Sequence, residues 1–207
     1  MYDDEFELTF DLSDEDEASR APEPEQEPVQ EATPEPAAET EPAAETEPPV
    51  EPVPEPAVPA ANGRCVLISG GDRGIGAAAA RAFWQAGYRV AVLYHTHAEA
   101  AAALEKALPG LLAVQCDVAS RASCEVAFHT VEQAVGHVDV LVSNAGIAQQ
   151  KLFTDITPEE WQHMLDVNLS GAFHLCQLAL PGMIRRKAGR ILTVSSMWGQ
   201  TGGSCEV

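Results

Sequence analysis

A run of glycines around one arginine, at residues 69–76, offers the clearest chemistry in the sequence. The segment is Ser69-Gly70-Gly71-Asp72-Arg73-Gly74-Ile75-Gly76. Gly70 permits a tight turn, Gly74 lets the backbone approach a ligand, and Gly76 lets a following helix pack on the preceding strand. A helix that begins here presents unpaired N–H groups and the positive end of its dipole to an anion. The segment therefore predicts a phosphate-binding loop, although a tight turn without a ligand would have the same spacing.

Further polar residues follow apolar runs later in the chain. They are Asp117-Val118, Ser143-Asn144-Ala145-Gly146 and Ser195-Ser196, and Asn168 stands between the last two groups. Ligands of open parallel sheets bind beyond the carboxyl ends of the strands, so we expect the residues that follow these apolar runs around one site. Taken alone, Ser196 is better explained as a strand-end serine with a backbone bond, and Asn168 as a helical asparagine that bonds a neighbouring carbonyl.

The elements that must position these residues alternate between strand and helix. Short Val/Ile/Leu runs predict strands at 66–69, 89–94, 111–116, 139–143 and 191–195. Helices are predicted after the glycine loop, at 98–108, at 120–135, from Pro158 and at 169–187. The first helix is expected to share one face among Ile75, Ala79, Ala82, Phe83 and Ala86, and to end at Gly87. Such alternation gives an α/β fold, a Rossmann-type doubly wound parallel sheet.

Residues 1–62 differ from the rest of the chain in composition. They carry 20 acidic residues against Arg20 alone, and 12 of the 15 prolines. Such a segment cannot bury enough apolar surface to offset its ordering entropy, so we expect a disordered acidic tail before a folded domain at 63–207. Alternating Phe6, Leu8, Phe10 and Leu12 are either chance composition or a short motif that adds a strand to a protein partner.

Charge and cysteine usage exclude several classes of function. The 12 acidic and 11 basic residues after residue 62 nearly balance, which predicts no nucleic-acid partner and no binding to a membrane. No apolar run reaches the ~18 residues that span a bilayer, and the acidic start of the chain does not resemble a signal peptide. Five cysteines without a Cys-x-x-Cys pair indicate reduced thiols, and no histidine pair has a third ligand nearby. We expect a cytoplasmic protein without a metal.

Together, the glycine loop and the later blocks resemble the short-chain dehydrogenase/reductase family over nearly all of residues 63–207. The family's loop is Thr-Gly-x-x-x-Gly-x-Gly, with Ser69 here in place of the threonine, and its Asn-Asn-Ala-Gly block has Ser143 in first place. The resemblance implies a nicotinamide dinucleotide cofactor. By matching position, the implied cofactor-binding residues are Ser69, Gly70, Arg73, Gly74, Ile75, Gly76, Asp117, Val118, Asn144, Ala145 and Gly146.

The same resemblance implies two catalytic residues. Ser196 matches the serine that hydrogen-bonds the substrate oxygen, and Asn168 matches an asparagine that holds a water in the proton relay. The family's general acid is a tyrosine in a Tyr-x-x-x-Lys motif, whose spacing from Ser196 places it two residues beyond Val207. We therefore expect this chain to be an N-terminal fragment, inactive by itself, with its sheet truncated after about five strands.

The form of the cofactor can be predicted from charge. An NAD-preferring site places an acid at the end of the second strand, where it binds the 2′-hydroxyl and repels a 2′-phosphate. Here that strand ends in Tyr94-His95-Thr96-His97, with no acid before Glu99. Arg73 can pair with a 2′-phosphate, whereas Asp72 beside it is a counterargument. We expect NADP(H).

The expected reaction is NADPH-dependent reduction of a carbonyl, on a small-molecule or carrier-bound substrate, because the overall pattern most resembles the 3-oxoacyl-carrier-protein reductases. An alternative is the branch that reduces the 5-aminopentanone modification on elongation factor P, which Ser195–Gly199 and Gly203–Val207 resemble. A different class of function is a non-catalytic dinucleotide-binding or interaction module. The complete protein is expected to form a homo-oligomer.

Overall fold

A five-stranded parallel sheet forms the centre of the computed structural model, which describes residues 60–201 except for the side chains of Trp198 and Gln200. Its strands are β1 Cys65–Ser69, β2 Arg89–Tyr94, β3 Leu112–Gln115, β4 Val140–Ser143 and β5 Arg190–Thr193. They lie in the order β3-β2-β1-β4-β5. From β1 the chain adds β2 and β3 on one side of the sheet, and then β4 and β5 on the other side. This strand order confirms the predicted Rossmann-type fold.

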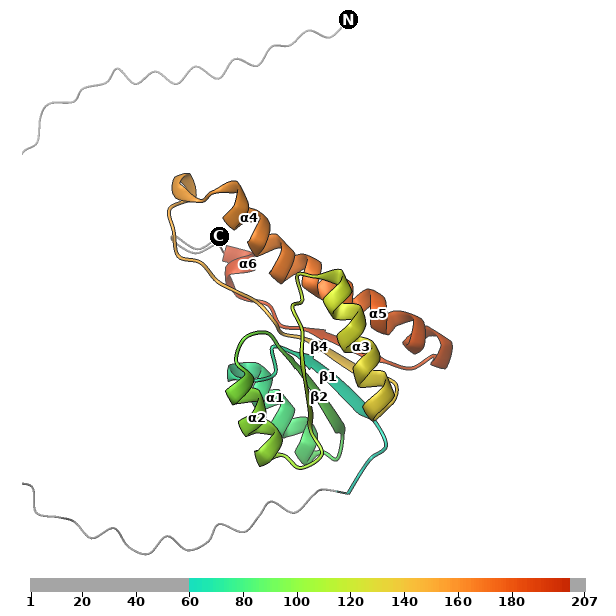
Figure 1. Ribbon diagram of the computed structural model, residues 1–207. Coiled ribbons are helices and arrows are strands. Elements are labelled where there is room, and N and C mark those ends of the chain that lie inside the picture. The colour runs from blue at the N-terminus through green and yellow to red at the C-terminus, as the bar shows by residue number, and fades with distance from the viewer. Residues whose placement is uncertain (1–59, 202–207) are drawn as a thin grey trace, which may run out of the picture. The chain divides into compact units, whose positions relative to one another are not determined.

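Helices cover both faces of this sheet (Figure 1). They are α1 Gly74–Gln85, α2 Ala98–Ala107, α3 Arg121–Val135, α4 Pro158–Leu165, α5 Gly171–Arg186 and α6 Trp198–Thr201, with a 3-10 turn at Phe153–Asp155 and a π turn at Asp166–Ser170. In β1, Val66 and Ile68 pack toward α1 and α2, whereas Cys65 and Leu67 pack toward α3 and α5. Successive side chains of a strand point to opposite faces, so β1 has to be apolar throughout.

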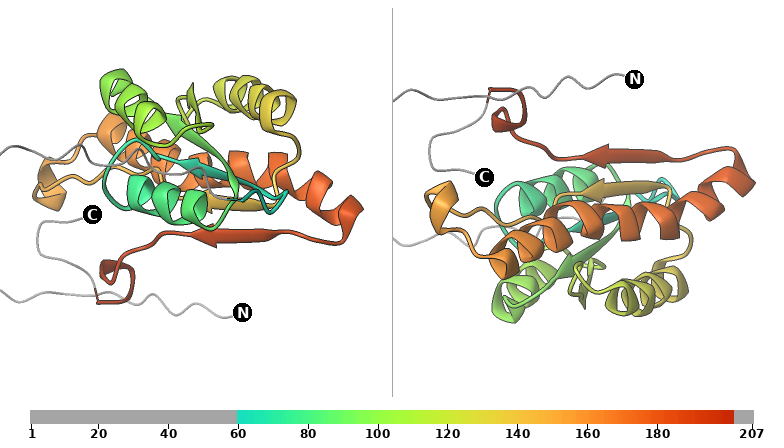
Figure 2. Two further views of the ribbon diagram at one scale, coloured as in Figure 1. Left: turned by 90° about the horizontal axis from the view of Figure 1, so that it is seen from below. Right: turned by 90° about the horizontal axis from the view of Figure 1, so that it is seen from above.

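The strand bounds predicted from the sequence agree with the structure to within two residues. The strands β3 and β5 form the two edges of the sheet within residues 60–201, and Figure 2 shows β5, in red, at its outer edge. Leu192 of β5 is 50% exposed, which fits a strand at the edge of the sheet. The expectations for the acidic tail up to residue 59 and for Gly203–Val207 lie outside the residues that the structure describes.

The predicted inward face of α1 is wrong. The helix buries Gly76, Ala77, Ala80 and Trp84, whereas Ile75 is 67% exposed. Ala82 and Ala86 are exposed as well, and Ala79 and Phe83 are only partly buried. The rotation of the helix fits the close approach of Gly76 to the glycine loop and the burial of the Trp84 ring. The indole Nε1 of Trp84 also donates to the carbonyl oxygen of Pro109 at 3.0 Å.

The segment from Pro158 to Arg186 is continuously helical, which the sequence did not predict. It begins with a capping box, in which Thr157 Oγ1 accepts from the Glu160 N–H at 3.2 Å and the Glu160 carboxylate accepts from the Thr157 N–H at 2.8 Å. The π turn then joins α4 to α5 and contains Asn168.

Within the part of the chain that is described, no helix is both long enough and apolar enough to cross a membrane.

Candidate functional site

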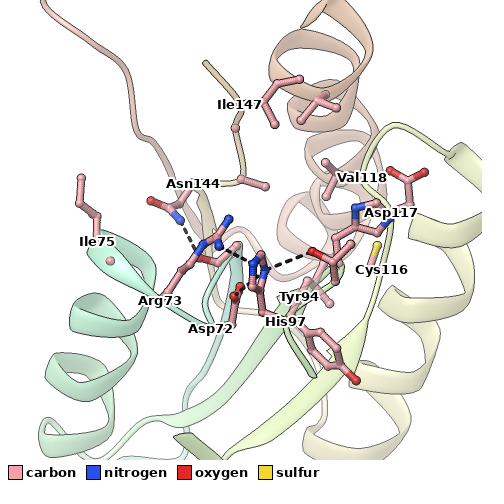
Figure 3. Close-up of a pocket in the computed structure, with 18 of the residues that line it drawn as sticks. Asp72, Arg73, Ile75, Tyr94, His97, Cys116, Asp117, Val118, Asn144 and Ile147 are labelled. Carbon is pink, nitrogen blue, oxygen red and sulfur yellow. Dashed lines mark hydrogen bonds and ion pairs between the residues drawn. The ribbon is translucent and has the colours of Figure 1, made fainter. Parts of the chain in front are cut away.

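A cleft of about 410 Å³ opens at the carboxyl ends of the strands (Figure 3). Nine of the predicted cofactor-binding residues line it, namely Gly70, Arg73, Gly74, Ile75, Asp117, Val118, Asn144, Ala145 and Gly146. They come from the loops that follow β1, β3 and β4, so the topology brings together residues that are far apart in the sequence. The residues that follow β2 complete the wall, with Tyr94, His95, Thr96 and His97.

The glycine loop leaves the start of α1 open to this cleft. Gly74 has φ +53°, and a Cβ added to it would meet no atom within 4 Å. Arg73 is the N-cap residue but its side chain makes no capping hydrogen bond, and the first turn of α1 contains no acidic residue. The N–H groups of that turn therefore have no competing side-chain acceptor, which fits a bound phosphate.

Gly76 does not line the cleft, although its motif predicted a part in the cofactor site. A Cβ at Gly76 would collide with the carbonyl oxygen of Gly70 and would stand 2.7 Å from Asn144 Nδ2. The absence of a side chain there allows the loop after β1 and the loop after β4 to meet. Gly76 therefore contributes to the site through packing.

Ser69 ties the same two loops together from below the cleft. Its hydroxyl is buried and accepts from the backbone N–H groups of Asn144 and Ala145, both at 3.0 Å. In return, Asn144 Nδ2 donates to the carbonyl oxygens of Ser69 and Gly70 at 3.0 and 2.9 Å. These four bonds explain why a hydroxyl residue suits position 69, and they give the cleft a fixed floor.

Asn168 lies beside the cleft and holds part of its rim. Its Oδ1 accepts from the Ile147 N–H at 2.8 Å, and its Nδ2 donates to the Ile147 carbonyl oxygen at 2.9 Å. The side chain thus saturates both backbone groups of the residue that follows Asn144-Ala145-Gly146. The π turn brings Asn168 to this position, and its part in a proton relay stays a prediction.

Ser196 follows β5 at the same edge of the sheet as the loop after β4. The Val194 N–H donates to the Ser143 carbonyl oxygen at 2.9 Å, which extends the pairing of β5 with β4 toward Ser196. Ser196 is exposed, and its carbonyl oxygen accepts from the Gly199 N–H at 3.1 Å. It does not line the cleft, and its contact with a substrate stays a prediction.

The end of the cleft beside β2 holds a cluster of charged and titratable groups. Arg73 NH1 lies 2.6 Å from His97 Nε2, and His97 Nδ1 lies 3.1 Å from Thr96 Oγ1. On its other side, His97 Nδ1 is 3.8 Å from Asp72 Oδ2. Figure 3 shows Arg73 and His97 pointing toward one another at the mouth of the cleft.

Among the lining residues that the sequence did not assign to the site are Cys116, Ile147, His163 and Val167. Cys116 directly precedes Asp117, and its Sγ lies 4.0 Å from that of Cys124. The hydrogen bond between the two thiols lowers the pKa of Cys116, whereas the same bond and burial raise the pKa of Cys124. Position after a strand was a usable signal for Cys116 and Ile147, whereas His163 and Val167 enter the cleft through the helical segment 158–186.

Comparison with known proteins agrees with this geometry. A family model described as short chain dehydrogenase matches residues 64–207. The acetoacetyl-CoA reductase of Shinella zoogloeoides is 40% identical over 139 residues, covering 67% of this chain and 57% of the relative. The acetoacetyl-CoA reductase of Rhizobium meliloti (strain 1021) is 41% identical with the same coverage. The 3-oxoacyl-[acyl-carrier-protein] reductase MabA of Mycobacterium avium is 40% identical over 144 residues, covering 68% of this chain and 53% of the relative. The chain thus spans a little over half the length of these relatives.

Proposed function

The chain belongs to the short-chain dehydrogenase family, and from this premise we propose that it supplies the nucleotide-binding half of an NADPH-dependent reductase. The proposed reaction converts the carbonyl of a 3-oxoacyl thioester into an alcohol. The observation that carries the proposal is the cleft at the carboxyl ends of the strands, lined by nine of the eleven residues that the sequence resemblance assigns to dinucleotide binding. The names of the relatives, which are acetoacetyl-CoA reductases and 3-oxoacyl-[acyl-carrier-protein] reductases, support the substrate class.

Each loop around the cleft has a proposed part in binding. The open N–H groups at the start of α1 would bind the pyrophosphate. Asp117 and Val118 would contact the adenine, and the loop that begins at Asn144 would contact the ribose next to the nicotinamide. The bound dinucleotide supplies the hydride. Ser196 would bind the substrate oxygen, and Asn168 would keep the rim at Ile147 in place.

The proposal assigns no general acid within the printed 207 residues. None of Tyr2, Tyr88 and Tyr94 is followed by a lysine four positions later. A positioned general acid typically accelerates a reaction by about 10²–10⁴-fold. We therefore propose that these 207 residues by themselves bind the nucleotide but reduce carbonyls slowly.

The preference for NADPH rests on the charges at the end of β2. Tyr94, His95, Thr96 and His97 add no carboxylate to this wall, and the guanidinium of Arg73 lies beside it. A 2′-phosphate would thus gain a charge-assisted partner and meet no acid on the strand that usually carries one.

Replacement of Arg73 by alanine tests this preference. The lost charge-assisted bond is worth about 1.5–3 kcal/mol, so NADPH binding should weaken roughly 10- to 150-fold while NADH binding changes little. Arg81→Ala is a matched control, because Arg81 is an exposed arginine of α1 that does not line the cleft. Fluorescence titration gives both dissociation constants. Equal losses for the two cofactors in Arg73→Ala would contradict the assignment.

An exposed apolar stripe on the helical segment supports the proposed homo-oligomer. Leu169, Phe173, Leu180 and Ile184 are 66%, 58%, 41% and 69% exposed. Their spacing of four, seven and four residues places them on one side of the helix. Exposed apolar residues that gather in this way commonly mark protein–protein contacts. Analytical ultracentrifugation of the full natural protein tests this proposal, and a monomer at micromolar concentration would contradict it.

A further inference from the structure

A buried carboxylate stands where the proposed cofactor would place its 2′-phosphate. The side chain of Asp72 lines the cleft but is only 6% exposed, and its Oδ2 has no hydrogen-bond partner in the described part of the chain. Two anions close together in a poorly solvated site repel each other strongly. A cleft that accepts a 2′-phosphate therefore needs a positive charge between that phosphate and Asp72.

His97 is the residue placed to supply that charge. It is the N-cap residue of α2, and its ring lies between Arg73 on one side and Asp72 on the other. A guanidinium can only donate, so His97 Nε2 must accept from Arg73, and the ring proton then sits on Nδ1. Nδ1 faces Thr96 Oγ1 and Asp72 Oδ2. Without a nucleotide, the hydrogen bond from Arg73 occupies Nε2 of His97.

A phosphate changes this balance, because it is a stronger acceptor for Arg73 than an imidazole nitrogen is. Once Arg73 turns to the phosphate, Nε2 of His97 is free to take a proton. The imidazolium would then have an anion on each side, the phosphate and Asp72. The other titratable groups nearby are His95 in the same loop, Glu99 in the first turn of α2 and Asp117 after β3. The two acids also favour a cation at this position, and histidine can change charge near neutral pH.

We infer that His97 is a specificity-determining residue, which takes up a proton when a 2′-phosphate binds and thereby shields that phosphate from Asp72. The inference rests on the proposed NADPH preference and adds a regulation to it, since NADPH affinity becomes dependent on pH. A cofactor with a 2′-hydroxyl brings no second anion. With NADH, His97 stays neutral and bonded to Arg73, so NADH affinity does not depend on this proton.

The test is equilibrium binding of NADPH and NADH to the full natural protein between pH 6 and pH 8. Binding linked to one proton gains at most tenfold per pH unit, and we expect NADPH affinity to rise about tenfold from pH 8 to pH 6. In His97→Gln the side-chain oxygen can still accept from Arg73 but the residue cannot be protonated. This variant should bind NADPH within about threefold of wild type at pH 8 and should lose the gain at pH 6.

Controls separate the protonation of His97 from that of other groups that titrate in the same pH range. The second ionisation of the 2′-phosphate, near pH 6, affects wild type and His97→Gln alike, so the difference between the two reports His97. His95→Gln removes a histidine that lines the same cleft without contacting Arg73 and should keep the gain. Calorimetry in buffers of different ionisation enthalpy should show that wild type takes up more protons than His97→Gln on binding NADPH. Thermal melting checks that each variant is folded.

The outcomes distinguish this inference from the proposed function. Wild type that prefers NADPH, with the same pH dependence in His97→Gln, would overturn the role of His97 and leave the cofactor proposal standing. Wild type that binds NADH as tightly as NADPH at every pH would overturn both. Loss of the pH-dependent gain in His95→Gln but not in His97→Gln would show that His95, and not His97, takes up the proton, and would overturn the inference.

Discussion

Replacement of Gly76 by alanine tests the contact that joins the two loops under the cleft. The new Cβ would collide with the Gly70 carbonyl oxygen and stand 2.7 Å from Asn144 Nδ2. The carbonyl belongs to the backbone and cannot move cheaply, so Asn144 would have to leave its two acceptors, the carbonyl oxygens of Ser69 and Gly70. The substitution should therefore destabilise the whole domain as well as the cleft.

The expected cost follows from these contacts. Two lost hydrogen bonds cost about 1 kcal/mol each, and overpacking adds about 1–3 kcal/mol. The better helix propensity of alanine returns up to about 1 kcal/mol. The net loss of unfolding free energy for Gly76→Ala is thus about 2–4 kcal/mol. Urea unfolding measures it, with the fluorescence of the buried Trp84 as one signal.

Gly74→Ala is the matched control, two residues away in the same loop. Its Cβ would meet no atom within 4 Å, but Gly74 has φ +53°, which costs an alanine roughly 1–2 kcal/mol. That Cβ would stand at the edge of the cleft, so this variant should fold and lose nucleotide affinity. If Gly76→Ala and wild type had the same urea midpoint, the close contact of Gly76 with the Gly70 carbonyl oxygen would be refuted. Wild-type NADPH affinity in Gly74→Ala would refute the placement of the phosphate.

Three further substitutions test other parts of the site. Ser69→Ala leaves two partly buried N–H groups of the loop after β4 without an acceptor, and urea unfolding should show a loss of about 2–4 kcal/mol. Asn168→Ala should speed hydrogen exchange at the Ile147 amide while amides in β1 keep their protection. Lys151 and a capping N–H hold the pKa of Glu160 below its usual value of 4.5, so wild type has a stabilisation above pH 4.5 that disappears as pH falls through the lowered pKa. Glu160→Gln should lack that pH-dependent part of the melting temperature, and identical pH profiles would contradict the capping role.

The order of the elements could be predicted from the sequence because each strand is a short apolar run that ends in glycine or a polar residue. The same pattern located the lining residues Gly70, Asp117 and Asn144, since strand ends of a parallel sheet meet at one edge. The apolar face that the sequence analysis assigned to α1 was wrong. The face is instead set by Gly76 and Trp84, whose contacts are with residues distant in sequence.

The contacts of individual residues of the glycine motif could not be predicted either. The motif groups Ser69 with the cofactor-binding residues, yet its hydroxyl is buried and accepts from the backbone of the loop after β4, a contact that the sequence did not predict. The contact between Arg73 and His97 joins two loops that are 24 residues apart, and no pattern in either loop indicates it. His163 of α4 lines the cleft as well, and no pattern in the sequence placed that helix beside it.

Steady-state oxidation of the two cofactors by the full natural protein, with acetoacetyl-CoA and a 3-oxoacyl-carrier-protein as substrates, tests the central proposal most directly. We predict that NADPH is oxidised with at least one of these substrates, and that kcat/KM is at least about tenfold higher with NADPH than with NADH, because one charge-assisted bond is worth that much. Equal rates with NADH would contradict the cofactor assignment. Nucleotide binding without oxidation in the presence of either substrate would contradict the reductase assignment and favour a non-catalytic dinucleotide-binding module or another substrate, such as modified elongation factor P.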